Sequence, residues 1–135
     1  MRVFLDTNVI VSAMATRGIC ADVLREVLVR HQLVISEKLL DEVKRVLLRK
    51  IGVPPAAAKD VLALLRDGSV MAVSVPPADL PLSNSADRAL LSAAVNGKAD
   101  LFITGDQELL DLLERGPMKI VPPRMFWEKV KDKRL

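Results

Sequence analysis

Residues 3–11 read VFLDTNVIV, in which two apolar triplets flank Asp6, Thr7 and Asn8. The first triplet predicts a short buried strand, and the polar tripeptide predicts the turn that ends this strand. The apolar residues after Asn8 predict that a helix follows. Asp6 stands directly after the strand, where a charged side chain must be paired, hydrated or bound to a metal ion.

The same strand-then-helix order continues along the chain. Strands are predicted at residues 2–5, 33–35, 70–73, 101–104 and 119–121. Helices are predicted on both sides of a break near residues 16–18, then at residues 37–50, 56–66, 86–96 and 106–114, and after residues 122–123. This alternation predicts an α/β fold, a three-layer α/β/α arrangement whose central, mostly parallel sheet has about five strands.

Two of these helices carry local signals for their ends. Ser36 is a good N-cap for the helix at residues 37–50, and the sequence GVPP at residues 52–55 should end that helix. Gly97 should close the helix at residues 86–96.

Length and composition indicate one globular domain. The chain has 135 residues, of which 50% are apolar and 27% charged, so residues 1–135 are expected to form a single domain with its own core. The formal net charge of +3 permits a polyanionic partner without requiring one. With three Phe, one Trp and no Tyr, stacking on several bases is not an expected mode of nucleic-acid binding.

The single cysteine, Cys20, cannot form an intrachain disulfide, which favours a reducing compartment and predicts a cytoplasmic protein. Asp6 and Asn8 interrupt the apolar N-terminal stretch, which therefore does not read as a signal peptide. No segment offers the ~18 uninterrupted apolar residues of a membrane span. We expect no association with a membrane.

Four acidic residues stand beside apolar segments: Asp6, Glu42, Asp87 and Asp106. Ligands of an open parallel sheet bind at the carboxyl ends of the strands, and Asp6 and Asp106 both follow predicted strands. Asp87 falls in the first turn of its helix, and Glu42 lies at the edge of the apolar stripe of its own helix. Asp6, Asp87 and Asp106 can converge if the first and fourth strands are neighbours.

Each acid also has a simpler explanation by itself. Asp87 and Asp106 can each interact with a helix dipole, an effect worth about 0.3–1 kcal/mol. Glu42 can pair with a neighbouring lysine, and Asp6 can form an Asx-turn. Together the acids indicate a metal site, because carboxylates in one crevice repel each other unless hard cations neutralise them. Ligation by oxygen atoms alone suits Mg²⁺ or Mn²⁺.

The residues that zinc sites, catalytic triads and nucleotide-binding loops require are largely missing from the sequence. His31 is the only histidine, so a zinc site built on histidines is unsupported, and a Ser-His-Asp triad would need that one residue. The chain has no Walker loop and no Gly-x-Gly-x-x-Gly segment.

Four segments that carry or lead to the four acids follow one another along the chain. They are FLDTNVIVS at residues 4–12, VISE at residues 34–37 leading to Glu42, ADRALL at residues 86–91 and KADLFITGD at residues 98–106. Together they resemble the PIN-domain family of nucleases, and specifically its VapC-like members, the toxins of bacterial and archaeal toxin–antitoxin pairs. Asp-Thr-Asn alone is a weak motif, whereas the ordered set is specific and spans nearly the whole chain.

The resemblance implies a divalent-metal-dependent ribonuclease with Mg²⁺ or Mn²⁺ as cofactor. The residues that match the family's acidic metal-binding quartet are Asp6, Glu42, Asp87 and Asp106. Its polar supporting positions are matched by Asn8 and Thr104. Asp6 would be the central ligand, and a metal-activated water would be the nucleophile in place of a histidine base. The implied products carry a 5′ phosphate and a 3′ hydroxyl.

One departure from the family concerns the third acid. Many relatives have an acid-rich loop before it, whereas residues 83–86 read SNSA here, so Asp87 stands alone and a second metal site is weakened. The resemblance further implies RNA as the substrate, a small antitoxin protein that blocks the acidic crevice, and a homodimer.

Two other functions stay open at this point: a PIN-fold module that binds RNA or protein without catalysis, and an RNA-processing nuclease without a toxin role. A cleavage assay with Asp6→Asn as control separates a nuclease from a binding module. A receiver-like domain phosphorylated on Asp6 is disfavoured, because it needs a lysine after a late strand, and Lys119 comes at the beginning of its strand.

Overall fold

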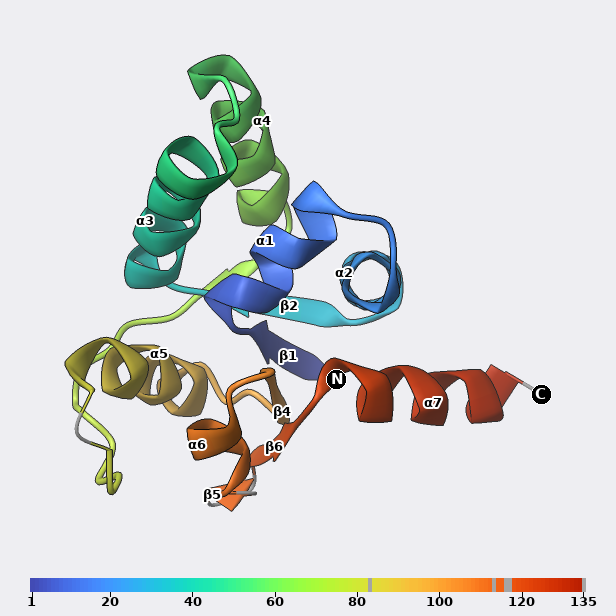
Figure 1. Cartoon of the computed structure of the whole chain (residues 1–135). Helices are drawn as coiled ribbons and strands as arrows, with labels where there is room; N and C mark the ends of the chain where they lie inside the picture. The colour runs from blue at the N-terminus through green and yellow to red at the C-terminus, as the bar shows by residue number, and fades with distance from the viewer. Residues whose placement is uncertain (83, 113, 116–117, 135) are drawn as a thin grey trace.

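The computed structural model describes residues 1–82, 84–112, 114–115 and 118–134 (Figure 1). The strands are β1 (Arg2–Leu5), β2 (Gln32–Ile35), β3 (Val70–Met71), β4 (Leu101–Ile103), β5 (Glu114–Arg115) and β6 (Met118–Val121). The helices are α1 (Thr7–Ala15), α2 (Ile19–Arg30), α3 (Glu37–Val46), α4 (Pro55–Arg66), α5 (Ser85–Asn96), α6 (Gln107–Leu110) and α7 (Pro123–Arg134), with a π-helical turn, η1 (Leu47–Ile51), after α3. Within these ranges, no helix is long and apolar enough to cross a membrane.

The strands form one sheet in the order β3-β2-β1-β4-β6-β5. The neighbouring pairs among β1, β2, β3, β4 and β6 are parallel, and β5 pairs antiparallel with β6. Helices α1 and α2 lie on one side of the strands, and α5 and α6 lie on the other (Figure 1). The structure therefore confirms the predicted three-layer α/β/α fold with its mostly parallel sheet.

β1 and β4 lie side by side at the middle of the sheet and carry the centre of the core. Val3, Phe4 and Leu5 of β1 are 0% exposed, as are Phe102 and Ile103 of β4. Phe4 is paired with Phe102 in the register, and the two rings stack with centroids 5.3 Å apart. Burial of these apolar side chains holds the two strands together. The residues that follow β1 and β4 are therefore brought to the same edge of the sheet.

The predicted helix ends are confirmed. Ser36 caps α3, because its Oγ accepts a hydrogen bond from the N–H of Leu39 (3.2 Å). Gly52 has a φ of 79°, in the left-handed region, and ends η1. Gly97 ends α5 against the sheet, where a Cβ would lie 2.7 Å from Val34 Cγ1. Glycine at this position lets α5 approach β2 closely.

The prediction of one helix over residues 106–114 is wrong beyond its first turn. α6 ends at Leu110, Asp106 is its N-cap, and Glu114–Arg115 forms β5 instead. Leu113 lies outside the described residues. The apolar residues of this segment have helical spacing, but antiparallel pairing with β6 outweighs local helix propensity.

Two further elements differ from their predicted extents. The helix predicted over residues 37–50 divides into α3 and η1, and β3 is shorter than residues 70–73. Beyond residue 72 the chain leaves β2, and the carbonyl oxygens of Val73 and Pro76 accept hydrogen bonds from Asn96 Nδ2 (2.8 and 3.0 Å). Contact with α5 replaces strand pairing there.

Candidate functional site

Asp6 lies at the carboxyl end of β1 and is the N-cap of α1. Its backbone N–H donates to the carbonyl oxygen of Ile103 in β4 (2.9 Å), and its Oδ1 accepts a hydrogen bond from the N–H of Thr7 (2.8 Å). Its Oδ2 accepts a hydrogen bond from Thr104 Oγ1 (2.7 Å), and the residue is 8% exposed. Helix capping accounts for one of its oxygens and the Thr104 hydroxyl for the other, but among the described residues no cation forms an ion pair with this buried charge.

Asp106 follows β4 and is linked to Asp6 through one hydroxyl group. Thr104 is 0% exposed, and its Oγ1 donates to Asp6 while accepting from the N–H of Asp106 (3.0 Å). Asp106 Oδ1 accepts from the N–H of Glu108 (2.9 Å). The simpler explanation, a carboxylate at a helix start, therefore applies to Asp106 in part. The condition that the first and fourth strands are neighbours is confirmed.

Glu42 reaches from α3 to the start of α1. Its Oε2 accepts a hydrogen bond from Thr7 Oγ1 (2.8 Å). Among the described residues it forms no ion pair with a lysine, so the simpler explanation for Glu42 is not what the structure shows. Thr7 instead joins two acids, because its N–H binds Asp6 and its hydroxyl binds Glu42.

Asp87 lies in the first turn of α5, but it does not cap that helix. The N-cap is Asn84, whose Oδ1 accepts hydrogen bonds from the N–H groups of Ala86 (2.9 Å) and Asp87 (3.1 Å). Capping of α5 therefore does not use the Asp87 carboxylate. Ser83, part of the segment in which the chain departs from the family, lies outside the described residues.

The electrostatics of Asp6 show that it faces two of the other acids. Burial raises the pKa of Asp6 above its ordinary value, and hydrogen bonds from Thr104 and Thr7 partly offset this rise. The negative charges of Asp106 and Glu42 raise the pKa further. A buried carboxylate that other carboxylates make harder to ionise is a strong attractor for positive charge.

Asp87 carries the clearest sign that the acids lie near one another. Burial is the largest cause that raises its pKa to about 6, followed by the charges of Asp6, Asp106, Glu108 and Glu42. Asp87 therefore lies close enough to the other three sequence-predicted acids for their charges to act on it. The structure adds Glu108 as a fifth negative group.

This raised pKa gives the metal-free protein an expected pH dependence. A carboxyl group with a pKa of about 6 in the folded chain, against an ordinary value of 3.8, binds its proton more tightly when folded. Stability is therefore lost as the pH rises from about 4 through about 6. In excess chelator we expect the Tm to fall by a few degrees between about pH 5 and about pH 7, and Asp87→Asn to reduce that fall.

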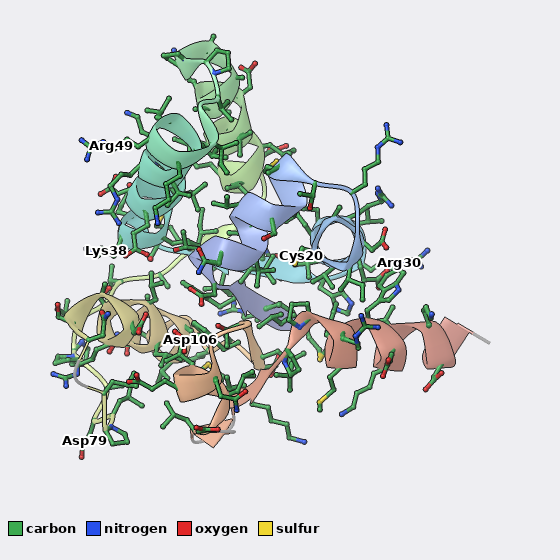
Figure 2. All side chains as sticks on the ribbon, viewed as in Figure 1. Cys20, Arg30, Lys38, Arg49, Asp79 and Asp106 are labelled. Atoms are coloured by element: carbon green, nitrogen blue, oxygen red, sulfur yellow. The ribbon has the colours of Figure 1, made fainter. Side chains whose placement is uncertain are left out.

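Thermal unfolding at the two pH values measures the effect. Asp79 is an exposed acid in the loop before α5 (Figure 2), and the matched control Asp79→Asn should keep the wild-type fall. Equal falls in the wild type and in Asp87→Asn would contradict the electrostatic account.

Three residues near the acids were not singled out from the sequence: Thr7, Asn84 and Glu108. Their signals are weak, since Thr7 is the central residue of the polar tripeptide, and Asn84 and Glu108 are each separated by only two or three positions from a predicted acid. Of the predicted supporting residues, Thr104 contacts the acids directly, and Asn8 is exposed in the first turn of α1.

The donor set suits a hard divalent cation in its chemistry, because all four groups are carboxylates and they repel one another. Among the described residues, however, no group of three or more Asp, Glu, His or Cys side chains is arranged so that it could hold a metal ion. The carboxylates of Asp6, Glu42 and Asp106 instead accept hydrogen bonds from Thr7, Thr104 and Glu108. An ion would have to compete with these hydrogen bonds to draw the acids together.

A cavity of about 530 Å³ lies away from these acids. It is found near the amino ends of β1 and β4, beside α2 and α7, and its lining includes Arg30, His31, Lys119, Phe126 and Lys129. None of the four acids lines it. The acidic site is therefore identified by its charged residues and by its position at the edge of the sheet. It does not coincide with this cavity.

Comparisons with known proteins agree with this arrangement. A family model described as the PIN domain matches residues 2–108. No curated protein sequence matches the chain. Among solved structures, the chain is similar to one described as the crystal structure of VapBC2 from Rickettsia felis bound to a DNA fragment from their promoter. The TM-score is 0.64 at 12% sequence identity, and the match covers 90% of this chain and 98% of that chain. At this identity the likeness shows the fold alone.

Proposed function

This chain belongs to the PIN-domain family of nucleases, and we propose on that basis that it is a divalent-metal-dependent endoribonuclease that hydrolyses RNA phosphodiester bonds. The observation that carries the proposal is the gathering of carboxylates at the carboxyl edge of β1 and β4, where Thr7 links Asp6 to Glu42 and Thr104 links Asp6 to Asp106. Burial, together with repulsion from neighbouring carboxylates, also raises the pKa of Asp6 and of Asp87. A fold under no functional demand gains nothing from this repulsion. The proposal takes residues 1–135 as one PIN-like domain.

The residues proposed to hold Mg²⁺ or Mn²⁺ are Asp6, Glu42, Asp87 and Asp106. Thr104 and the N–H of Thr7 orient the Asp6 carboxylate, and the Thr7 hydroxyl orients Glu42. Asn8, exposed in the first turn of α1, is proposed as a polar supporting residue. When bound, the ion supplies positive charge that stabilises the scissile phosphate, and it lowers the pKa of a water molecule.

Metal removal tests this proposal directly. We expect cleavage of single-stranded RNA to fall to background in excess chelator and to return with Mg²⁺ or Mn²⁺, because the acids by themselves repel the phosphate. The same ions should raise the Tm of the wild type, since a ligand that binds only the folded state stabilises it. Cleavage that persists at full rate in chelator would overturn the metal-dependent mechanism.

We further propose that the chain is the toxin of a type II toxin–antitoxin pair, located in the cytoplasm, with a small antitoxin protein as partner and a homodimer as its assembly. The likeness to the VapBC2 complex supports this role.

Expression of the wild type should arrest growth, whereas expression of Asp6→Asn should not. A light-scattering mass equal to one chain would contradict the dimer, and normal growth with active enzyme would favour RNA processing over a toxin role.

A further inference from the structure

The surface of α3 and η1 carries a concentration of positive charge beside the acidic site. The exposed basic residues of this segment are Lys38, Lys44, Arg45, Arg49 and Lys50. The chain as a whole has a formal net charge of only +3, so five cations within 13 consecutive positions are a local feature. Such a concentration is the usual footprint of a polyanionic partner.

Three of these cations form a row along one face of the helix. Seven positions separate Lys38 from Arg45 within α3, a spacing that returns a side chain to the same face of an α-helix. Arg49 follows four positions after Arg45, in η1. Figure 2 shows the side chains of Lys38 in α3 and Arg49 in η1 extending away from α1. The row spans about 15 Å along the axis. We call Lys38, Arg45 and Arg49 the α3 basic row.

The α3 basic row adjoins the acidic site through Glu42. Glu42 stands four positions after Lys38 and three before Arg45, which places it next to the row on the helix surface. Its side chain turns toward α1, where it accepts the hydrogen bond from Thr7. One short helix therefore supplies an acid to the site and cations to the surface beside the site.

The three cations of the row lack the ion pairs that would tie them to the fold within the described part of the chain. Among the described residues, none of the three has an ion-pair partner. The neighbouring acids interact elsewhere: Glu37 accepts two hydrogen bonds from Arg66 (3.1 and 3.0 Å), and Asp41 also interacts electrostatically with Arg66. Exposed, unpaired arginines suit bidentate contact with phosphate groups.

From these observations we propose that the α3 basic row binds the phosphate backbone of the RNA strand on one side of the scissile bond. This inference rests on the proposed ribonuclease function and assigns its substrate-binding surface. The three Phe side chains are buried, so base stacking on Phe is unavailable and the charge contacts carry the binding. The row offsets the repulsion that the acids exert on an approaching phosphate.

Salt dependence of RNA binding tests the assignment. The probe is a fluorescein-labelled single-stranded oligouridylate, and its binding is followed by fluorescence anisotropy in excess chelator. The slope of log K against log salt changes by about 0.7 for each phosphate contact on a single strand. Replacing all three residues (Lys38→Gln, Arg45→Gln, Arg49→Gln) should therefore flatten the slope by about 2.

A matched control removes three exposed charges from another helix. On α7 these are Arg124, Lys129 and Lys131, each changed to Gln, and the wild-type slope should persist. With Mg²⁺ present, the row variant should raise KM at least about tenfold and change kcat by less than about threefold, as expected when only substrate binding is lost. Equal slopes and equal KM values in the row variant and the α7 variant would overturn the assignment.

The remaining outcomes separate this inference from the proposed function. Row-dependent binding of the oligouridylate by a wild type that cleaves no RNA would overturn the ribonuclease proposal and support the row. A row variant that keeps its RNA affinity but loses affinity for a poly-glutamate peptide would assign the row to an acidic protein and overturn the RNA inference. A wild type that neither binds nor cleaves the oligouridylate would overturn both.

Discussion

Asp6→Asn should lower RNA cleavage by about 10³-fold or more while the protein stays folded. Asp6 is the acid at the centre of the site, since its carboxylate is buried, contacts Thr104 and faces both Asp106 and Glu42. Asparagine removes the charge and keeps the side-chain shape. The loss of rate therefore reports the charge and not the packing.

The same substitution should raise the stability of the metal-free protein. Burial and neighbouring carboxylates raise the pKa of Asp6, so the folded state favours an uncharged side chain at this position. The asparagine Oδ1 can still accept the hydrogen bond from the N–H of Thr7, and its Nδ2 can donate to Thr104 Oγ1 in place of the hydrogen bond that Asp6 Oδ2 accepts. We expect the Tm in chelator to increase by about 2–5 °C and the stabilisation by Mg²⁺ to disappear.

These opposite signs make the experiment decisive. A variant that loses activity because it unfolds would have a lower Tm, whereas the mechanism requires a lower rate with a higher Tm. Single-turnover cleavage and thermal unfolding on the same preparation measure both, with Asp79→Asn as the control that should leave rate and Tm unchanged. Cleavage by Asp6→Asn within about threefold of the wild type would remove Asp6 from the active site.

The positions of Asp6 and Asp106 were predictable from the sequence because each follows a run of aliphatic residues. The carboxyl ends of parallel strands meet at one edge of a sheet, so a strand-then-acid pattern carries spatial information. What the pattern did not contain was the order of the strands. β1 and β4 are adjacent, with Phe4 packed against Phe102, and no local spacing encodes that contact.

The least predictable parts are those set by tertiary hydrogen bonds. Glu42 has lysine and arginine neighbours along its helix, which favoured a surface ion pair, but Thr7 from a distant segment binds it instead. β5 was equally hard to predict, because its pairing with β6 depends on a sheet edge that exists only after the sheet has formed. In each case a long-range partner outweighs a plausible local one.

Phe102→Ala should destabilise the protein by about 3–5 kcal/mol, the usual cost of truncating a buried phenylalanine. Phe102 is 0% exposed and stacks on Phe4 with the ring planes 7° apart, so the substitution leaves a void between the two central strands. A domain of this size has a total stability of about 5–15 kcal/mol. The Tm should fall by about 10–20 °C.

Urea unfolding measures this loss, and Val29→Ala supplies the control, because Val29 is 71% exposed and its truncation should change the free energy of unfolding by less than about 0.5 kcal/mol. Phe102→Leu refills most of the volume and should recover much of the stability. Since Thr104 and Asp106 follow Phe102 on the same strand, activity assayed well below the Tm reports whether their positions survive. If Phe102→Leu regains stability but not activity, the ring itself holds the acidic edge in place; if it regains both, strand pairing alone positions Asp6 and Asp106.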